Sequence, residues 1–171
     1  MTEPAKVLVA DPPWKFGDSL PGKGRGASKH YGCLSLSEIM RFPLPPIADD
    51  CVLFLWRVSS MPQEALDVVR AWGFKPYAEI VWRKMTPRGK VAFGMGRRVR
   101  MAHETCIIAE RGRPKPISRS ERSVFDAVVG QHSAKPDEFY QIVERMYGGP
   151  RVELFARRRR DGWQCFGDEL T

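Results

Sequence analysis

Short, continuous hydrophobic runs recur along the chain and alternate with segments of helical periodicity. The runs are rich in β-branched and aromatic residues, which is typical of strands covered on both faces of a sheet. Five runs are VLVA (7–10), CVLFLW (51–56), AEIVWR (78–83), TCIIAE (105–110) and RVELFAR (151–157), and WQCFG (163–167) is a shorter sixth. These six segments are the predicted strands.

The segments between the runs carry signals for helix ends. Three helices are expected over 35–42, 59–74 and 135–150. Ser35 and Glu38 have capping-box spacing, Ser60 is a candidate N-cap before Pro62, and Pro136 suits the opening of the last helix. Strand and helix alternation predicts a single α/β domain over 1–171, with a mainly parallel sheet flanked by helices.

Composition narrows the class of protein. The 171 residues are 43% hydrophobic and 28% charged, as in ordinary globular proteins. No apolar run approaches the roughly 20 residues of a membrane helix, and the N-terminus lacks a signal-peptide pattern, so a cytoplasmic protein without membrane contact is expected. The four cysteines form no CxxC pair, which argues against a zinc site, and no metal is expected.

The charge of the chain points to a polyanionic partner. Its 28 Lys and Arg residues against 20 acids give a formal net charge of +8. The cations concentrate in four stretches, 21–30, 83–100, 110–122 and 156–160. Loops of this kind can lie along a phosphate backbone, so nucleic acid is the expected partner, although a role in solubility alone stays open.

The stretch VLVADPPW suggests the chemistry. Asp11 stands at the carboxyl end of the first predicted strand, where open parallel sheets bind ligands. Pro12 and Pro13 fix the backbone and remove two donors, which predicts free carbonyl acceptors, and Trp14 is expected to present a broad aromatic face. An exocyclic amino group of a nucleobase could donate to Asp11 and to the Pro12 carbonyl while the ring stacks on Trp14. The alternative is a stiffened strand exit with a core tryptophan.

This tetrapeptide resembles the catalytic motif of methyltransferases that act on amino groups of nucleic acids. A wider set of seven motifs in order resembles the MT-A-seventy-like family of adenine-N6 methyltransferases. The matching segments are 10–14, 30–39, 53–58, 79–84, 103–112, 132–145 and 152–170. The resemblance implies a Rossmann-like fold of permuted motif order, S-adenosylmethionine as cofactor, and transfer of a methyl group to N6 of adenine in nucleic acid.

The same resemblance assigns site residues. It implies the catalytic residues Asp11, Pro12, Pro13 and Trp14. It implies the cofactor-binding residues Asp11, Lys135, Glu153, Leu154, Phe155, Arg157, Asp168 and Glu169. Lys135 would meet the cofactor's carboxylate and Phe155 the adenosyl group. Tyr31, Trp82 and Glu104 would surround the substrate base.

Some positions depart from the pattern of the messenger-RNA enzyme in that family. Asp168 and Glu169 stand where that enzyme has neutral amides, and Arg159 and Arg160 where it has histidine and asparagine. These departures leave the ribose contacts open. They do not change the cofactor class that the resemblance implies.

We therefore expect an adenine-N6 methyltransferase, with DNA favoured as substrate and RNA as the alternative. A non-catalytic nucleic-acid-binding subunit of a methyltransferase heterodimer is a second alternative, which the intact Asp11 disfavours. A small-molecule methyltransferase is a third, which the net charge disfavours. A homodimer and a heterodimer with a related subunit both stay open.

Overall fold

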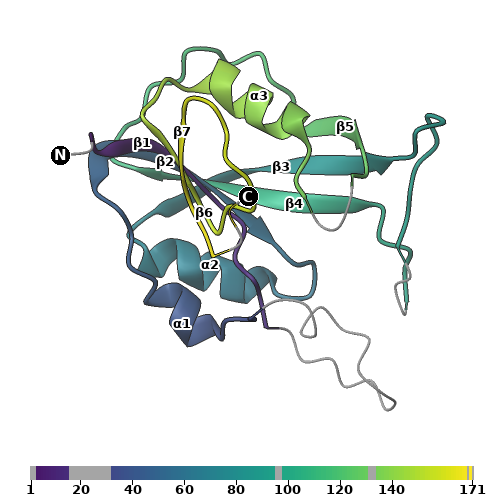
Figure 1. The fold of residues 1–171 in the computed structure, drawn as a ribbon, viewed down its shortest axis with the longest axis horizontal. Coiled ribbons are helices and arrows are strands. Elements are labelled where there is room, and N and C mark those ends of the chain that lie inside the picture. Colours follow the sequence, from purple (N-terminus) through teal and green to yellow (C-terminus); the bar gives the residue numbers. More distant parts are fainter. Residues whose placement is uncertain (1–2, 16–31, 95–97, 131–133, 169, 171) are drawn as a thin grey trace.

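A twisted seven-stranded sheet forms the centre of the computed structural model, which describes residues 3–15, 32–94, 98–130, 134–168 and 170 (Figure 1). The strands are β1 (Ala5–Ala10), β2 (Ile47–Arg57), β3 (Lys75–Met85), β4 (His103–Arg111), β5 (Val124–Val128), β6 (Arg151–Leu154) and β7 (Trp163–Phe166). Their order is β5-β3-β4-β2-β1-β6-β7, and β4 alone among these strands runs antiparallel to its neighbours. The prediction of a mainly parallel α/β sheet is confirmed.

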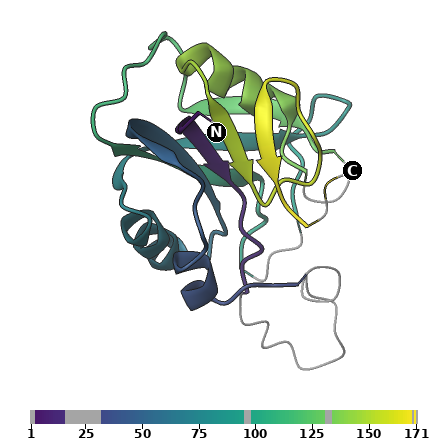
Figure 2. The ribbon, with the colours of Figure 1, turned by 60° about the vertical axis from the view of Figure 1, so that its left-hand side comes forward.

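Helices cover both faces of the sheet. The helices are α1 (Leu36–Met40), α2 (Pro62–Ala71) and α3 (Asp137–Met146). The first two lie on one face and α3 lies on the other, as the two views show (Figures 1 and 2). The Ser35 side chain and Glu38 form the predicted capping box. Ser60 does not cap α2, whose N-cap is Met61 without a side-chain bond and whose first residue is Pro62.

Two hydrophobic cores explain why the strand runs are continuous rather than alternating. Leu8 and Ala10 of β1 pack towards α1 and α2, whereas Val7 and Val9 pack towards α3. Every position of this strand except Lys6 is therefore buried. A strand that is buried on both faces does not alternate between polar and hydrophobic residues. This is why its sequence is a continuous hydrophobic run.

Strand β5 was missed by the sequence reasoning. It is an edge strand in which Val124 and Val128 are exposed and Asp126 forms an ion pair with Arg83. A five-residue edge strand with a central charge lacks the hydrophobic run that predicted the others. The run at 151–157 is also shorter than predicted, since β6 ends at Leu154.

The carboxyl edge of the sheet gathers the residues of interest. Strands β1, β2, β3 and β6 end there, and the antiparallel β4 begins there. Within the described part of the chain, no helix is long and apolar enough to cross a membrane. The same residues contain no group of three or more His, Cys, Asp or Glu side chains that could hold a metal ion.

Candidate active site

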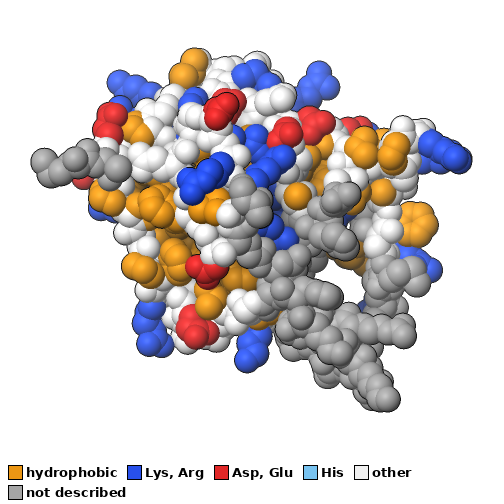
Figure 3. Space-filling model, viewed as in Figure 1, with side chains coloured by type: hydrophobic (Ala, Val, Ile, Leu, Met, Phe, Trp, Pro, Cys, Tyr) orange, Lys and Arg blue, Asp and Glu red, His pale blue; other side chains and the backbone are white. Residues whose placement is uncertain are grey.

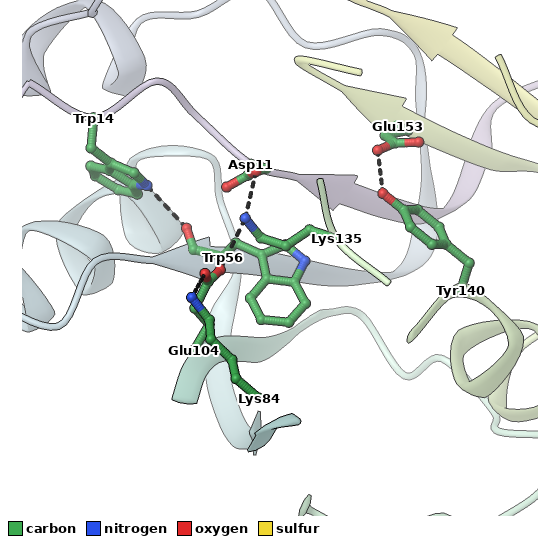
Figure 4. Close-up of polar contacts among 8 residues, drawn as sticks. All are labelled: Asp11, Trp14, Trp56, Lys84, Glu104, Lys135, Tyr140 and Glu153. Atoms are coloured by element: carbon green, nitrogen blue, oxygen red, sulfur yellow. Dashed lines mark hydrogen bonds and ion pairs between the residues drawn. The ribbon is translucent and has the colours of Figure 1, made fainter. Parts of the chain in front are cut away.

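An ion pair between Asp11 and Lys135 lies at the centre of this edge (Figure 4). Lys135 lies just before α3, and its Nζ donates to Asp11 Oδ2 at 2.7 Å and contacts Glu104 Oε2 at 3.1 Å. Its side chain is only 8% exposed. Burial lowers the pKa of Lys135, but the two carboxylates outweigh burial, so this pKa lies above its ordinary value. Lys135 is therefore a charged bridge between β1 and β4.

Lys84 extends the cluster on the other side of Glu104. Its Nζ lies 2.6 Å from Glu104 Oε1, and Glu104 thus faces two ammonium groups. Burial raises the pKa of Glu104, but Lys135 and Lys84 together hold it below its usual value. Asp11, Lys135, Glu104 and Lys84 form a neutral row of alternating charges, and mutual pairing offsets the cost of taking them out of water.

Trp56 forms the floor of this cluster. It ends the buried part of β2, is itself buried, and has its ring centroid 5.1 Å from Lys135 Nζ. The negative face of an indole attracts an ammonium group, so Trp56 helps to hold Lys135 in place. Its backbone carbonyl accepts a hydrogen bond from Trp14 Nε1 at 3.1 Å. Trp56 thereby links the ion cluster to the Asp-Pro-Pro-Trp segment.

The Asp-Pro-Pro-Trp segment differs from the sequence prediction in two respects. The Pro12 carbonyl accepts the Trp14 N–H at 2.8 Å in a three-residue turn, and the Pro13 carbonyl accepts the Leu34 N–H at 2.9 Å. The carbonyls are therefore not free, although a carbonyl that accepts one bond keeps a second lone pair. Trp14 is 5% exposed and packs in the core on the side of α1 and α2, so it does not present an open face. Stacking of a base on Trp14 stays a prediction.

A pocket of about 730 Å³ lies beside this segment, between α1 and the ends of β6 and β7. Pro13, Phe42, Phe155 and Asp168 line it. Phe155 follows β6 directly with φ of +59°, which turns the chain out of the strand and explains why β6 is shorter than predicted. The rings of Phe155 and Phe42 have centroids 4.5 Å apart. The pocket thus offers aromatic walls with a carboxylate at its lining.

Glu153 has a structural contact of its own. It is buried on β6 and accepts a hydrogen bond of 2.5 Å from the Tyr140 hydroxyl of α3 (Figure 4). Burial raises the pKa of Glu153 despite this bond and the nearby Arg160, which stacks on the Tyr140 ring at 3.6 Å. In this structure Glu153 joins β6 to α3, and its predicted contact with the cofactor stays a prediction.

The other predicted residues fall into three groups. Leu154 is buried in the core, Arg157 is half-buried, and Asp168 is exposed at the pocket. Trp82 is 2% exposed, donates its indole N–H to the Ala127 carbonyl, and has its ring centroid 5.3 Å from Lys84 Nζ, so it packs under the Lys84 end of the cluster. Its contact with a substrate base stays a prediction. Tyr31 and Glu169 lie outside the described residues, as does the basic stretch 21–30.

Sequence reasoning missed three residues that organise the site. Trp56 and Lys84 lie at the carboxyl ends of two predicted strands. Open parallel sheets bind ligands at these ends, so the reasoning that singled out Asp11 could have found both residues. Tyr140 carries no such signal. Its partner Glu153 comes from a different element, and only the packing of α3 on β6 brings the two together.

The residues present fit a cofactor with an adenosyl group and an amino-acid end. The volume of the pocket lies in the range of small-molecule sites. Aromatic walls suit a purine, and the Asp168 carboxylate suits hydroxyl donors of a ribose. Asp11 stands two residues before Pro13, which lines the pocket, and Asp11 with its partner Lys135 carries the charges that complement an ammonium and a carboxylate.

Comparison with known proteins agrees with this geometry. A family model described as MT-A70 matches residues 5–169. An N(6)-adenosine-methyltransferase MT-A70-like protein of Drosophila melanogaster is 30% identical over 96% of this chain and 26% of its own length. The human N(6)-adenosine-methyltransferase catalytic subunit METTL3 is 30% identical over 96% of this chain and 28% of its own length.

A shorter relative is also similar. The type II methyltransferase M.MunI of Mycoplasma sp is 29% identical over 96% of this chain and 77% of its own length. This chain therefore spans about a quarter of the length of the N(6)-adenosine-methyltransferases that it matches, and most of the type II enzyme. Since the family model covers the whole sheet and the charged cluster, this chain belongs to the MT-A70 family.

Proposed function

We propose that this protein transfers a methyl group from S-adenosylmethionine to N6 of adenine in nucleic acid, with DNA as the favoured substrate. The observation that carries the proposal is Asp11. Its carboxylate stands at the carboxyl edge of the sheet, is held by Lys135 through Oδ2, and comes two residues before Pro13, which lines the aromatic pocket. Asp11 Oδ1 has no hydrogen-bond partner among the described residues and is turned away from Lys135 (Figure 4).

Asp11 and Pro12 can orient an amino group. One N–H donates to Asp11 Oδ1 and the other to the second lone pair of the Pro12 carbonyl. With both protons held, the nitrogen lone pair points out of the base plane, which is the orientation that a conjugated amine needs to react. After the transfer the nitrogen is acidic, and Asp11 Oδ1 can accept the proton that it releases.

The pocket at β6 and β7 would hold the cofactor. Phe155 and Phe42 would contact its adenine, Asp168 its ribose, and Asp11 with Lys135 its amino-acid end. The cofactor supplies an electrophilic methyl group on a sulfonium. Trp56 and the ion pairs around Lys135 keep Asp11 fixed, so that the acceptor atoms are in place before the base enters.

The choice of nucleic acid rests on two observations. The net charge of +8 suits a phosphate backbone of either kind. The chain matches a type II methyltransferase over 77% of that enzyme's length, but N(6)-adenosine-methyltransferases over only about a quarter of theirs. The second comparison favours DNA, and RNA is the second substrate to test because those longer relatives are named for adenosine.

A transfer assay with an Asp11 variant tests the proposal. Tritiated S-adenosylmethionine is offered with single- and double-stranded DNA and RNA of matched sequence. We expect Asp11→Asn to lower the transfer rate by about 100-fold or more, because the amide loses one acceptor and the proton-accepting oxygen. Asp67→Asn, on the exposed face of α2, is the matched control and should retain the rate. Equal rates for Asp11→Asn and the wild type would refute the role of Asp11.

A further inference from the structure

Strands β3 and β4 continue beyond the sheet as a projecting hairpin. It extends from the carboxyl edge, on the right of Figure 1, and covers residues 85–94 and 98–102 of the described chain. Its backbone is held by hydrogen bonds from Ala92 N–H to the Lys84 carbonyl and from Gly94 N–H to the Met101 carbonyl, both 2.8 Å long. The described part of this hairpin is thus anchored to the sheet rather than loosely attached.

The hairpin exposes an aromatic ring together with cations. Phe93 is 63% exposed, and the guanidinium of Arg100 lies 5.8 Å from its ring centroid. Val91 and Val99 on the same hairpin are also exposed. In the space-filling view, hydrophobic side chains and Lys and Arg side chains lie together on the projecting right-hand end (Figure 3). One exposed apolar residue is ordinary, but an aromatic ring among aliphatic and cationic side chains is typical of a binding surface.

The charge of the hairpin has one sign. Between Lys84 and Met101 the sequence has six cations and no acid. Lys84 pairs with Glu104, and the other cations among the described residues of the hairpin are Arg88, Lys90, Arg98 and Arg100. A surface with this charge and an exposed ring matches the two features of a nucleic acid, its phosphates and its stacked bases.

A continuous series of contacts joins Phe93 to the candidate catalytic carboxylate. Asp11 pairs with Lys135, Lys135 with Glu104, and Glu104 with Lys84. The Lys84 carbonyl in turn accepts the N–H of Ala92, the residue before Phe93. The ring therefore projects from the backbone that carries one end of the charged cluster, on the same edge of the sheet.

We propose that Phe93 is a wedge that enters the base stack of duplex DNA at the position vacated by the target adenine. This inference rests on the proposed function. A base inside a duplex cannot reach Asp11 unless it leaves the stack, and the gap that it leaves is costly. An aromatic ring fills this gap by stacking on the neighbouring bases, while Arg100 and the other cations bind the flanking phosphates. Phe93 is thus a positioning residue that favours the extruded base.

A binding measurement tests the wedge without requiring catalysis. Fluorescence anisotropy compares a labelled duplex that contains one tetrahydrofuran abasic residue with the intact duplex. A ring that fills an empty stacking position should make the wild type bind the abasic duplex about tenfold more tightly, in line with base–aromatic stacking. Phe93→Ala should abolish this preference and Phe93→Trp should retain it. Val99→Ala, an equally exposed apolar residue on the same hairpin, is the matched control and should also retain it.

The outcomes separate this proposal from the proposed function. A wild type without preference for the abasic duplex, or a Phe93→Ala variant that keeps it, overturns the wedge. If the wild type transfers no methyl group to any nucleic acid, the proposed function fails, whereas loss of the abasic preference in Phe93→Ala still supports the wedge. Where transfer is observed, Phe93→Ala should lower the ratio of duplex to single-strand methylation about tenfold, since a single strand leaves no paired gap to fill. Equal losses on both substrates contradict the proposal.

Discussion

Two glutamates on either side of Asp11 have different kinds of partner. Glu104 forms ion pairs with lysines, whereas Glu153 forms a hydrogen bond with a tyrosine. Glu104 is the second residue of β4 and Glu153 lies in β6, with β2 and β1 between these two strands. Burial raises the pKa of both carboxyl groups. Lys135 and Lys84 bring the pKa of Glu104 below its ordinary value, whereas for Glu153 burial outweighs the hydrogen bond from the neutral Tyr140 and the nearby Arg160, so its pKa stays raised. The charge of the neighbouring groups, and not the degree of burial, therefore decides which of the two carboxylates is held in its charged form.

This difference assigns separate roles to the two sides of the cluster. The side of Glu104 is a row of ion pairs that connects β3, β4 and the segment before α3 with Asp11. The side of Glu153 is a buried hydrogen bond, covered by the Tyr140 ring and by Arg160, that fastens α3 to β6. Lys135 precedes α3, so this fastening also fixes where the ammonium meets Asp11.

Removal of Lys135 is the most severe test of the charged side. Lys135→Met leaves the partly buried carboxylates of Asp11 and Glu104 without their shared cation. We expect a loss of about 3–5 kcal/mol in the free energy of unfolding, measured by urea denaturation, because an uncompensated buried charge is costly. Arg70→Met is the control, since its ion pair with Asp67 is exposed, and it should cost less than about 1 kcal/mol. Similar losses for both variants would show that Lys135 is an ordinary surface lysine.

Substitution of Glu104 should have a smaller effect that depends on pH. The lowered pKa of Glu104 means that its stabilisation is present above the unfolded value of about 4.5 and is lost as the pH falls through the folded value. We expect Glu104→Gln to lose about 1.5–3 kcal/mol at neutral pH, the size of a hydrogen bond to a charged group. Unfolding curves of the variant and the wild type should converge in acid. A constant difference at all pH values would contradict the charge assignment.

Substitution of Glu153 should have the smallest effect on the free energy of unfolding, and it should raise this free energy where the other two substitutions lower it. Because the pKa of Glu153 is raised, its contribution is complete below the unfolded value and is lost as the pH rises through the folded value. Glu153→Gln keeps an acceptor for Tyr140 but cannot ionise. We expect the variant to gain about 0.5–1 kcal/mol over the wild type in mild alkali, comparable with one neutral hydrogen bond. Thermal unfolding of both proteins across a range of pH measures this gain. If the variant is instead less stable than the wild type in alkali, Glu153 is charged in the folded protein.

Continuous hydrophobic runs and strand ends were the reliable signals in the sequence. Six strands, three helices and the position of Asp11 at a strand end are confirmed. The edge strand β5 was missed because its pattern is broken by Asp126, which a buried strand would not contain. Trp14 was expected to present an aromatic face, with a core tryptophan as the alternative, and the burial of its ring depends on α1 and β2, which come later in the chain.

The partner of Lys135 could not be read from the sequence either. The resemblance to a family assigned this lysine to the carboxylate of a cofactor, whereas in the structure it meets Asp11 and Glu104. These residues are far apart in the chain and meet only because β1 and β4 reach the same edge as the start of α3. Contact with the cofactor stays a prediction, and it would require Lys135 to share its donors between the carboxylates and the ligand.

The most direct test of the account is the identity of the methylated nucleoside. The wild type is incubated with S-adenosylmethionine that carries a deuterated methyl group, together with DNA or RNA, and the digested nucleosides are analysed by mass spectrometry. We expect the label on N6 of adenine nucleosides from DNA. Label on a different atom or base, or no label in any nucleic acid, would contradict it.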